Sequence, residues 1–280
     1  MSSPGFEFCE RPNGCILMPG GLEPLCGRWP RPLKPRARRT GYALVLLAIA
    51  LVLLPRSTNA EAKYSPLLEF TSNYVYRGYS KSNGAPVFQG NIDYEHSSGF
   101  FLGTWVSQVD FGHERYQGHV NLEANPYVGV SLGLSENWRF GTTLAGYLYD
   151  GKVYGHEADY GEINALLYFR DLLTAHVGAS YDAYGRGRLT LNYEIDLRYP
   201  VTDTVEVSSG LGYEDANTVL SYNRVYWYVG AGWFLGKHVA LALRYYDAQQ
   251  FDELKGGAEN TRFKPPGISN HVVFSISIGF

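Results

Sequence analysis

The chain has only three cysteines, and all of them lie near the N-terminus, at Cys9, Cys15 and Cys26. The residues that follow can therefore form no disulfide, no thiolate metal site and no cysteine nucleophile. Long apolar runs are also scarce: Tyr42–Leu54, at thirteen residues, is too short for a membrane helix, which needs about 20. Neither sign of charge dominates, with 24 Lys+Arg against 27 Asp+Glu, which argues against nucleic acid as a partner.

The first 60 residues have the organisation of a secretory leader. A basic stretch, Arg31–Arg39, precedes the apolar run 42–54, and Thr58-Asn59-Ala60 supplies the small residues of a cleavage site. We expect cleavage between residues 60 and 61 and a mature chain of residues 61–280. Met1 and Met18 are the only methionines, so translation can start later than Met1 and residues before 28 need not be made. A retained signal anchor is the alternative, which the cleavage site and the short apolar run disfavour.

Removal of the leader leaves an acidic, aromatic-rich chain. Residues 61–280 hold 16 Lys+Arg (24 minus 8) and 24 Asp+Glu (27 minus 3), a net charge of −8. They keep all tyrosines except Tyr42 and all tryptophans except Trp29. Such rings, apolar with one polar end, suit the interface between a membrane and water. No cofactor is indicated.

The last ten residues, His271–Phe280, alternate strictly between two faces. Apolar side chains run through every second position to Phe280, while the other face is polar apart from Val273. A soluble protein rarely ends on such a sticky edge strand, whereas a transmembrane barrel uses it to close the sheet. A terminal Phe after alternating apolar residues also resembles the segment by which the barrel-assembly machinery of Gram-negative bacteria recognises outer-membrane proteins.

Similar alternation recurs along the mature chain and predicts an all-β fold of twelve strands. In the third of these, we expect Phe101, Trp105 and Val109 to form the apolar face. Pro126 falls inside the fourth and predicts a bulge or a shorter strand there. The expected strands are 67–76, 87–94, 100–109, 119–133, 138–149, 160–169, 173–181, 189–198, 205–213, 224–233, 239–246 and 271–280.

The predicted connections differ in length in a regular way. Those after even-numbered strands are short, whereas those after odd-numbered strands are mostly longer, among them 79–86, 110–118, 150–159, 214–222 and 247–270. Short turns on one side and long loops on the other are typical of outer-membrane barrels whose two termini are periplasmic. The sequence therefore predicts a transmembrane up-and-down antiparallel β-barrel in the outer membrane of a Gram-negative bacterium. A soluble β-sandwich or barrel is the alternative.

Three motifs in order resemble a known family. Ser72–Ser80 (SNYVYRGYS), Pro86–Gly90 (PVFQG) and Ser98–Ser107 (SGFFLGTWVS) are similar to the N-terminal motif series of the TorF-type porins of proteobacterial outer membranes, formerly described as a conserved protein of unknown function. The motif block covers about residues 70–111. The resemblance implies an outer-membrane barrel and a channel, and it supplies neither a substrate nor a site.

Charged residues on the polar strand faces are the candidates for lining a pore. An interior of mixed charge suits water better than a dry core. Twelve strands lie between the filled barrels of about 8 and the wide pores of 16–18, so we expect a narrow passive channel for small solutes. Equally, the same residues can form ion pairs that brace the wall and block the bore. The candidates are Glu69, Arg77, Asp93, Glu123, Arg139, Glu162, Glu194, Asp196, Arg198, Glu206, Arg224 and Arg244.

Other functions have weaker support in the sequence. We expect no enzyme, because His96 with Ser98, and His271 with Ser275, are not predicted to face each other, and no paired-carboxylate motif appears. A divalent metal site from His113, Glu114, His156 and Glu157 is possible, but solvated loop tips explain these residues more simply. The main alternative to a channel is a non-conducting structural or adhesive barrel whose loops, above all 247–270, bind a partner. Oligomeric state is left open.

Overall fold

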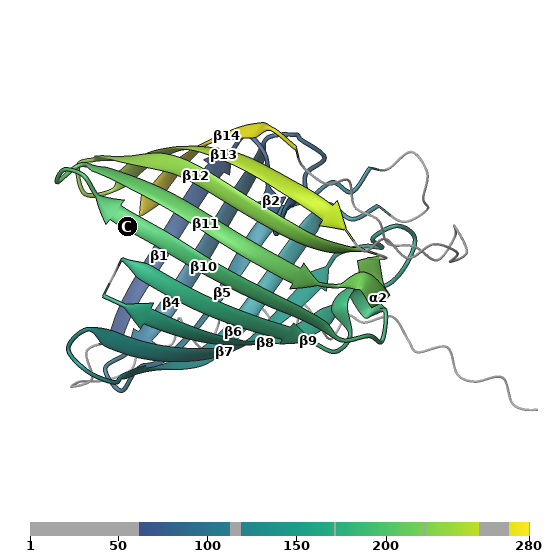
Figure 1. Ribbon diagram of the computed structural model, residues 1–280, viewed down its shortest axis with the longest axis horizontal. Coiled ribbons are helices and arrows are strands. Elements are labelled where there is room, and N and C mark those ends of the chain that lie inside the picture. The colour runs from purple at the N-terminus through teal and green to yellow at the C-terminus, as the bar shows by residue number, and fades with distance from the viewer. Residues whose placement is uncertain (1–61, 113–118, 171, 221, 252–268, 280) are drawn as a thin grey trace, which may run out of the picture. The chain divides into compact units, whose positions relative to one another are not determined.

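The computed structural model describes residues 62–112, 119–170, 172–220, 222–251 and 269–279. The predicted leader, the loop tip at 113–118 and Phe280 lie outside the described residues. Within these ranges the chain is almost wholly strand (Figure 1). The strands are β1 (Ala62–Thr71), β2 (Val75–Tyr76), β3 (Tyr79–Ser80), β4 (Val87–His96), β5 (Phe100–Gln108), β6 (Leu122–Gly133), β7 (Trp138–Tyr149), β8 (Tyr160–Phe169), β9 (Leu173–Ser180), β10 (Thr190–Pro200), β11 (Val205–Asp215), β12 (Asn223–Leu235), β13 (Val239–Phe251) and β14 (His271–Gly279).

Twelve of these strands form one closed antiparallel barrel, in the order β1-β14-β13-β12-β11-β10-β9-β8-β7-β6-β5-β4. The barrel closes where the first strand meets the last, with Leu67 opposite Gly279 and Thr71 opposite Ser275. β1 pairs on its other side with β4 over its whole length. The prediction of a twelve-stranded antiparallel barrel closed by the C-terminal strand is therefore confirmed.

The connections follow the predicted asymmetry. Five turns of three or four residues (97–99, 134–137, 170–172, 201–204 and 236–238) lie at one end of the barrel, here called the turn end. The strands that flank the longer connections meet them at the opposite end, here called the loop end. Two short helices occur there, η2 (Ala183–Gly185) and α2 (Asn217–Leu220). Among the described residues, no helix has the length and apolar character needed to span a bilayer.

The alternation predicted from the sequence separates an apolar outer face from a polar inner one. In β10, Ile195 is 53% exposed whereas Asn192 is 1% exposed. In β14, Val272 and Phe274 are exposed while Val273 and Ser275 are buried, as predicted for its two faces. Exposed large side chains recur on strands all around the ring, including Leu68, Phe88, Val128, Leu144, Ile163, Leu211, Val229 and Leu243.

The predicted first strand, 67–76, was wrong at both ends. β1 starts five residues earlier, at Ala62, and ends at Thr71. Val75 and Tyr76 instead pair with Tyr79 and Ser80 in a small separate hairpin, β2–β3. Alternating apolar residues continue through both segments, so periodicity did not separate them. The predicted outward loop at 79–86 consequently begins inside this hairpin.

The predicted faces of the third strand were also wrong. In β5, Ser107 accepts a hydrogen bond from the inward-facing Gln89, and Trp105 lies opposite Asn91. Phe101 packs on Tyr127, with ring centroids 6.5 Å apart, so this face looks into the barrel. Apolar residues occupy both faces of β5, and alternation therefore could not decide which side meets water.

Pro126 produces neither a bulge nor a break. β6 runs through it, starting at Leu122 rather than at the predicted residue 119. Its pairing with β7 skips Asn125 and Pro126 but resumes at Tyr127 with the register unchanged. The Asn125 side-chain amide donates to the Gly146 carbonyl across this gap, at 3.4 Å. A side chain thus supplies the donor that a proline nitrogen lacks.

Candidate functional site

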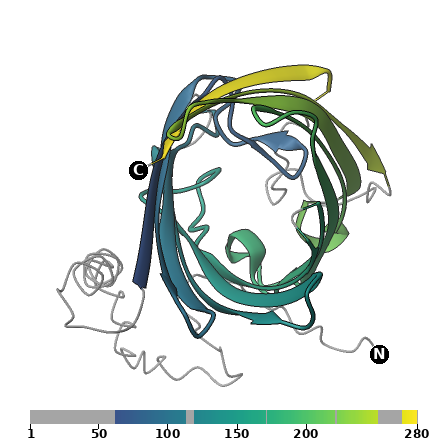
Figure 2. The ribbon, with the colours of Figure 1, turned by 90° about the vertical axis from the view of Figure 1, so that its left-hand side faces the viewer.

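The connection between β1 and β4 folds into the barrel instead of extending outward (Figure 2). Its hairpin turns at Arg77 and Gly78, whose φ angles of 45° and 78° are both left-handed. Two such residues between paired strands form the tight turn that matches strand twist. A Cβ on Gly78 would lie 2.7 Å from the Cβ atoms of Ala248 and of Tyr226. The hairpin tip therefore presses against the wall formed by β12 and β13.

The base of the hairpin is fixed by side chains of its own segment. Asn73 accepts hydrogen bonds from the hydroxyls of Ser80, at 2.6 Å, and Ser82, at 3.0 Å. The Lys81 amide donates to the Tyr74 carbonyl at 2.8 Å. Tyr79, Lys81 and Ser82 are all 0% exposed. The segment is therefore a packed part of the barrel interior.

Arg77 joins the hairpin tip to the opposite wall. Its two terminal nitrogens donate to the two carboxylate oxygens of Glu162 on β8, each at 2.8 Å. Glu214 on β11 lies 3.8 Å from the same guanidinium and also accepts a hydrogen bond from Arg224 on β12. Two arginines and two glutamates thus form one buried network, in which bidentate geometry fixes position as well as charge.

Lys81 forms the second link. Its ammonium lies 2.8 Å from both carboxylate oxygens of Glu123 on β6, and both side chains are fully buried. The ammonium also lies 3.9 Å from the centroid of the Tyr76 ring. Burial lowers the pKa of Lys81 from its usual value, and the neighbouring Glu123 opposes that shift. Such a pair holds its position because either charge alone would be costly in a dry interior.

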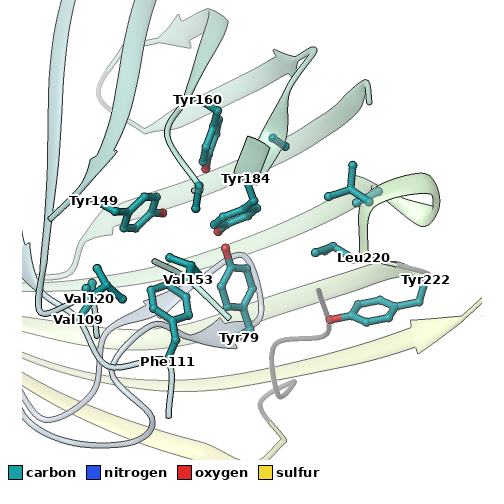
Figure 3. Packing of buried hydrophobic residues seen from close by; sticks show 14 residues of the cluster. Tyr79, Val109, Phe111, Val120, Tyr149, Val153, Tyr160, Tyr184, Leu220 and Tyr222 are labelled. Carbon is teal, nitrogen blue, oxygen red and sulfur yellow. The ribbon is translucent and has the colours of Figure 1, made fainter. Parts of the chain in front are cut away.

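An apolar cluster fills the loop end beside the hairpin. Figure 3 shows Tyr79 of the hairpin facing Tyr184, with Phe111 and Val153 close by and Leu220 from α2 on the far side. Its buried members are Tyr79, Val109, Phe111, Val120, Tyr149, Val153, Ala158, Tyr160, Ala183, Tyr184, Ala216, Val219, Leu220 and Tyr222. They come from five loop-end connections and the strand ends beside them, so this cluster narrows the lumen.

A cavity of about 480 Å³ lies in the lumen next to the hairpin tip. Arg77 and Glu162 form part of its wall, together with His176 and Glu194. The His176 ring contacts the Glu194 carboxylate through Nδ1, at 2.9 Å, and the Asn164 side-chain oxygen through Nε2, at 2.7 Å. Tyrosines supply much of the remaining lining: Tyr76, Tyr147, Tyr226, Tyr228 and Tyr246.

Charged side chains nearer the turn end are more exposed. The Arg198 side chain is 58% exposed and donates to Glu206, at 2.9 and 3.0 Å. Arg139 is exposed and lies over the Tyr168 ring, 4.6 Å from its centroid. In contrast, Glu123 and Arg224 at the loop end are buried. The lumen is thus packed at the loop end and becomes wetter toward the turn end.

All but one of the predicted lumen residues lie on inward faces of barrel strands; Arg77 lies on the hairpin. The structure brings Arg77 to Glu162 and Arg198 to Glu206, and binds Arg224 to Glu214. Glu69 accepts from Ser277 at 2.7 Å, while Asp93 accepts from Asn91 and Tyr127. Asp196 accepts from Tyr228 at 2.8 Å, and the Arg244 guanidinium lies 6.0 Å from the same ring's centroid.

Sequence reasoning missed several residues of this site. The sequence predicts an outward loop at Lys81 and the start of another at Glu214. His176, Asn164 and the cavity tyrosines were assigned to strands without a role. Lys81 carried a usable signal, because it closely follows Tyr76-Arg77-Gly78-Tyr79, in which a glycine stands where a two-residue hairpin turn favours one.

The residues considered for a metal site or an enzyme receive little support from the structure. His113 and Glu114 lie outside the described residues, and His156 forms a bridge with the backbone of Val153. No group of three or more potential metal ligands occurs in the described part of the chain. His96 and Ser98 do touch, at 2.8 Å, contrary to expectation. The Ser98 amide also donates to the same ring nitrogen, so this contact stabilises an exposed turn.

Comparison with known proteins places the chain in a family. A family model described as "Bacterial protein of unknown function (Gcw_chp)" matches residues 58–280, and the chain belongs to this family. The narrower likeness to TorF-type porins stays a prediction. No curated protein sequence matches the chain.

Solved structures show only distant similarity. The "KdgM porin" has 10% identity and a TM-score of 0.46, covering 77% of this chain and 98% of that one. An outer-membrane channel from Pseudomonas putida F1 has 10% identity and a TM-score of 0.46, covering 80% and 96%. A deletion mutant of the TodX monoaromatic hydrocarbon channel has 9% identity and a TM-score of 0.46, covering 82% and 92%. Similarity this low carries no argument about function.

Proposed function

We propose that this protein is a channel in the outer membrane of a Gram-negative bacterium that passes small solutes. The outer face supports the membrane location, because exposed apolar side chains such as Leu144 and Ile163 recur around a ring with no free edge. Most barrel strands have 9–13 residues, close to the 9–11 that cross a bilayer when tilted. Lipid is the partner that covers such a surface.

The inner face supports the channel. A lumen with exposed charges such as Arg139 and Arg198 at its turn end contains water, because a dry interior would leave no solvent to cover them. This polar interior inside an apolar exterior is the observation that carries the proposal. The candidate pore-lining residues on this path are Glu69, Asp93, Arg139, Glu194, Asp196, Arg198, Glu206 and Arg244, while Arg77, Glu123, Glu162 and Arg224 hold the constriction.

The hairpin sets the size limit of the proposed channel. It crosses the lumen from β1 to the wall at Ala248 and Tyr226, and its two cations are bound to buried carboxylates. A solute must pass beside this segment or displace it. We further propose that the turn end and both chain termini are periplasmic, and that β14 with Phe280 is recognised by the assembly machinery.

Single-channel recording in a planar bilayer tests the proposal. The protein is incorporated after removal of the predicted leader, and its folding is checked by heat-modifiable gel mobility. We expect steady openings whose conductance grows in proportion to salt concentration, from about 0.1 to about 1 M. Folded protein that stays silent at both salt concentrations would refute the channel.

The packed loop end favours a second candidate, a non-conducting barrel whose loops bind a partner. Its support is the complete burial of Tyr79, Lys81 and Ser82. A variant that loosens the hairpin separates the two candidates. Gly78→Val should raise conductance if the hairpin narrows a channel, and should leave a silent barrel silent if other loop-end segments also close it.

A further inference from the structure

The lumen cavity beside the hairpin tip is lined by many tyrosines. Its lining also has more carboxylate side chains than lysines and arginines. Among the described residues that line it, Arg77 is the only lysine or arginine, against the carboxylates of Glu162, Glu194 and Asp247. Both terminal nitrogens of Arg77 are bound to Glu162, and Glu214 lies 3.8 Å away. The positive charge of Arg77 is therefore already balanced, and a net negative charge remains at the cavity.

Glu194 supplies part of that charge in the lining, and Asp196 stands next to it on the same strand, bound to a tyrosine of the lining. Glu194 and Asp196 are two positions apart on the inner face of β10, so their Cα atoms are about 7 Å apart. Glu194 contacts His176, and Asp196 accepts a hydrogen bond from the Tyr228 hydroxyl. Within the described ranges, neither carboxylate forms an ion pair with lysine or arginine. Arg244 on β13 lies over the Tyr228 ring, 6.0 Å from its centroid.

Tyrosine rings line the cavity next to these acids. Tyr226, Tyr228 and Tyr246 line the cavity on the side of β12 and β13, with Tyr228 and Tyr246 centroids 5.5 Å apart. The negative face of an aromatic ring attracts a cation, and quaternary ammonium groups are recognised by sets of such rings. Carboxylates next to ring faces are therefore suited to an organic cation more than to a strongly hydrated metal ion.

The same barrel already holds its own cations in this way. The Lys81 ammonium lies between the Glu123 carboxylate and the Tyr76 ring, and the Arg224 guanidinium lies 4.3 Å from the Tyr79 ring centroid beside Glu214. At the loop end these places are filled by the chain itself. In the cavity, Glu194 and the tyrosine rings of the lining face open space, and Asp196 is hydrogen-bonded to the hydroxyl of one of these tyrosines, Tyr228.

We propose that this cavity binds small organic cations, that is, protonated amines or quaternary ammonium ions. Glu194 and Asp196 supply the opposing charge, and the rings of Tyr226, Tyr228 and Tyr246 contact the alkyl groups. The inference rests on the proposed channel function for its biological role, and it names the class of solute that the channel admits. An anion would face the same carboxylates and be repelled.

Calorimetric titration of the whole protein in detergent micelles tests the site without requiring conduction. The probe is tetramethylammonium chloride, with sodium chloride at equal ionic strength as the reference. We expect saturable binding that weakens at least about tenfold in the double variant Glu194→Gln/Asp196→Asn, because both opposing charges are lost. Glu206→Gln is the matched control, since this inward acid does not line the cavity and its partner is Arg198, whereas Asp196 is bound to Tyr228 of the lining. It should bind like the wild type.

A second variant keeps the test informative if the double variant fails to fold. Tyr228→Phe retains the ring and releases the Asp196 carboxylate from its hydroxyl partner, so binding should be at least as tight as in the wild type. The absence of saturable binding to folded wild-type protein, or tighter binding of glucose than of tetramethylammonium, would overturn the proposal. Binding in a protein that conducts no current would instead count against the channel alone.

Discussion

Arg77 and Glu162 meet across the barrel lumen through two hydrogen bonds of 2.8 Å, although 85 positions separate them in the chain. One lies at the tip of a four-residue turn and the other near the start of the wall strand β8. Their side chains are 7% and 2% exposed, so water screens the pair weakly. This contact ties the folded-in hairpin to the wall, and it provides the most direct way to disturb the hairpin.

Replacing Glu162 by Gln should destabilise the barrel by about 3–5 kcal/mol, because Arg77 would keep its buried charge and lose its main counterion. The measurement is the free energy of unfolding in urea, with the protein in lipid vesicles. Glu206→Gln is the matched control, since its partner Arg198 is largely exposed and such pairs contribute about 0–1 kcal/mol. Equal losses of unfolding free energy in the two variants would show that the Arg77–Glu162 pair stabilises the barrel no more than a solvent-exposed pair does.

Lys81 and Glu123 should show strong coupling in a double-mutant cycle. Lys81→Met and Glu123→Gln alone each leave one fully buried partner without its match, at a cost of about 3–5 kcal/mol. The double variant should recover much of that loss, because no charge then remains buried. Unfolding free energies of the four proteins give the coupling. Strictly additive losses would mean that the two residues stabilise the barrel independently.

Gly78→Val should prevent the hairpin tip from seating. The new side chain would collide with the Cβ atoms of Ala248 and Tyr226, and its φ of +78° is unfavourable for a branched residue. We expect trypsin to cleave after Lys81 in this variant and to spare the wild type, where Lys81 is fully buried. Gly84→Val is the control, because its φ is +77° with open space around it. Wild-type protection of Lys81 in both variants would contradict the packed position of the hairpin.

Leu144→Arg and Thr143→Arg place the same charge on opposite faces of β7. Leu144 is exposed on the outer face, whereas Thr143 lines the lumen cavity. If lipid covers the outer face, Leu144→Arg should cost about 2–4 kcal/mol of folding stability in vesicles, and Thr143→Arg clearly less. The reverse order would place the apolar face away from lipid and remove the basis of the membrane assignment.

The strand pattern was the part most open to prediction. Segments such as Leu189–Arg198 alternate cleanly because one face meets an apolar medium and the other a polar one, and this constraint acts on each residue locally. The closing strand at 271–280 was recognised for the same reason. The faces of β5 were predicted wrongly because Phe101 and Trp105 are aromatic residues that face the lumen. Both faces of this strand therefore carry apolar residues. Alternation identifies a strand, but when both of its faces carry apolar residues the pattern does not show which face points outward.

The sequence by itself determined a twelve-stranded antiparallel barrel, its apolar outer face and its unequal ends, because these features depend on a period of two and on the lengths of connections. Only the tertiary structure decided that residues 72–82 turn inward. It also decided that Lys81 and Arg77 meet Glu123 and Glu162, and that a cavity remains beside Glu194. Each of these depends on contacts between residues tens of positions apart, which register and barrel closure bring together and which no local pattern encodes.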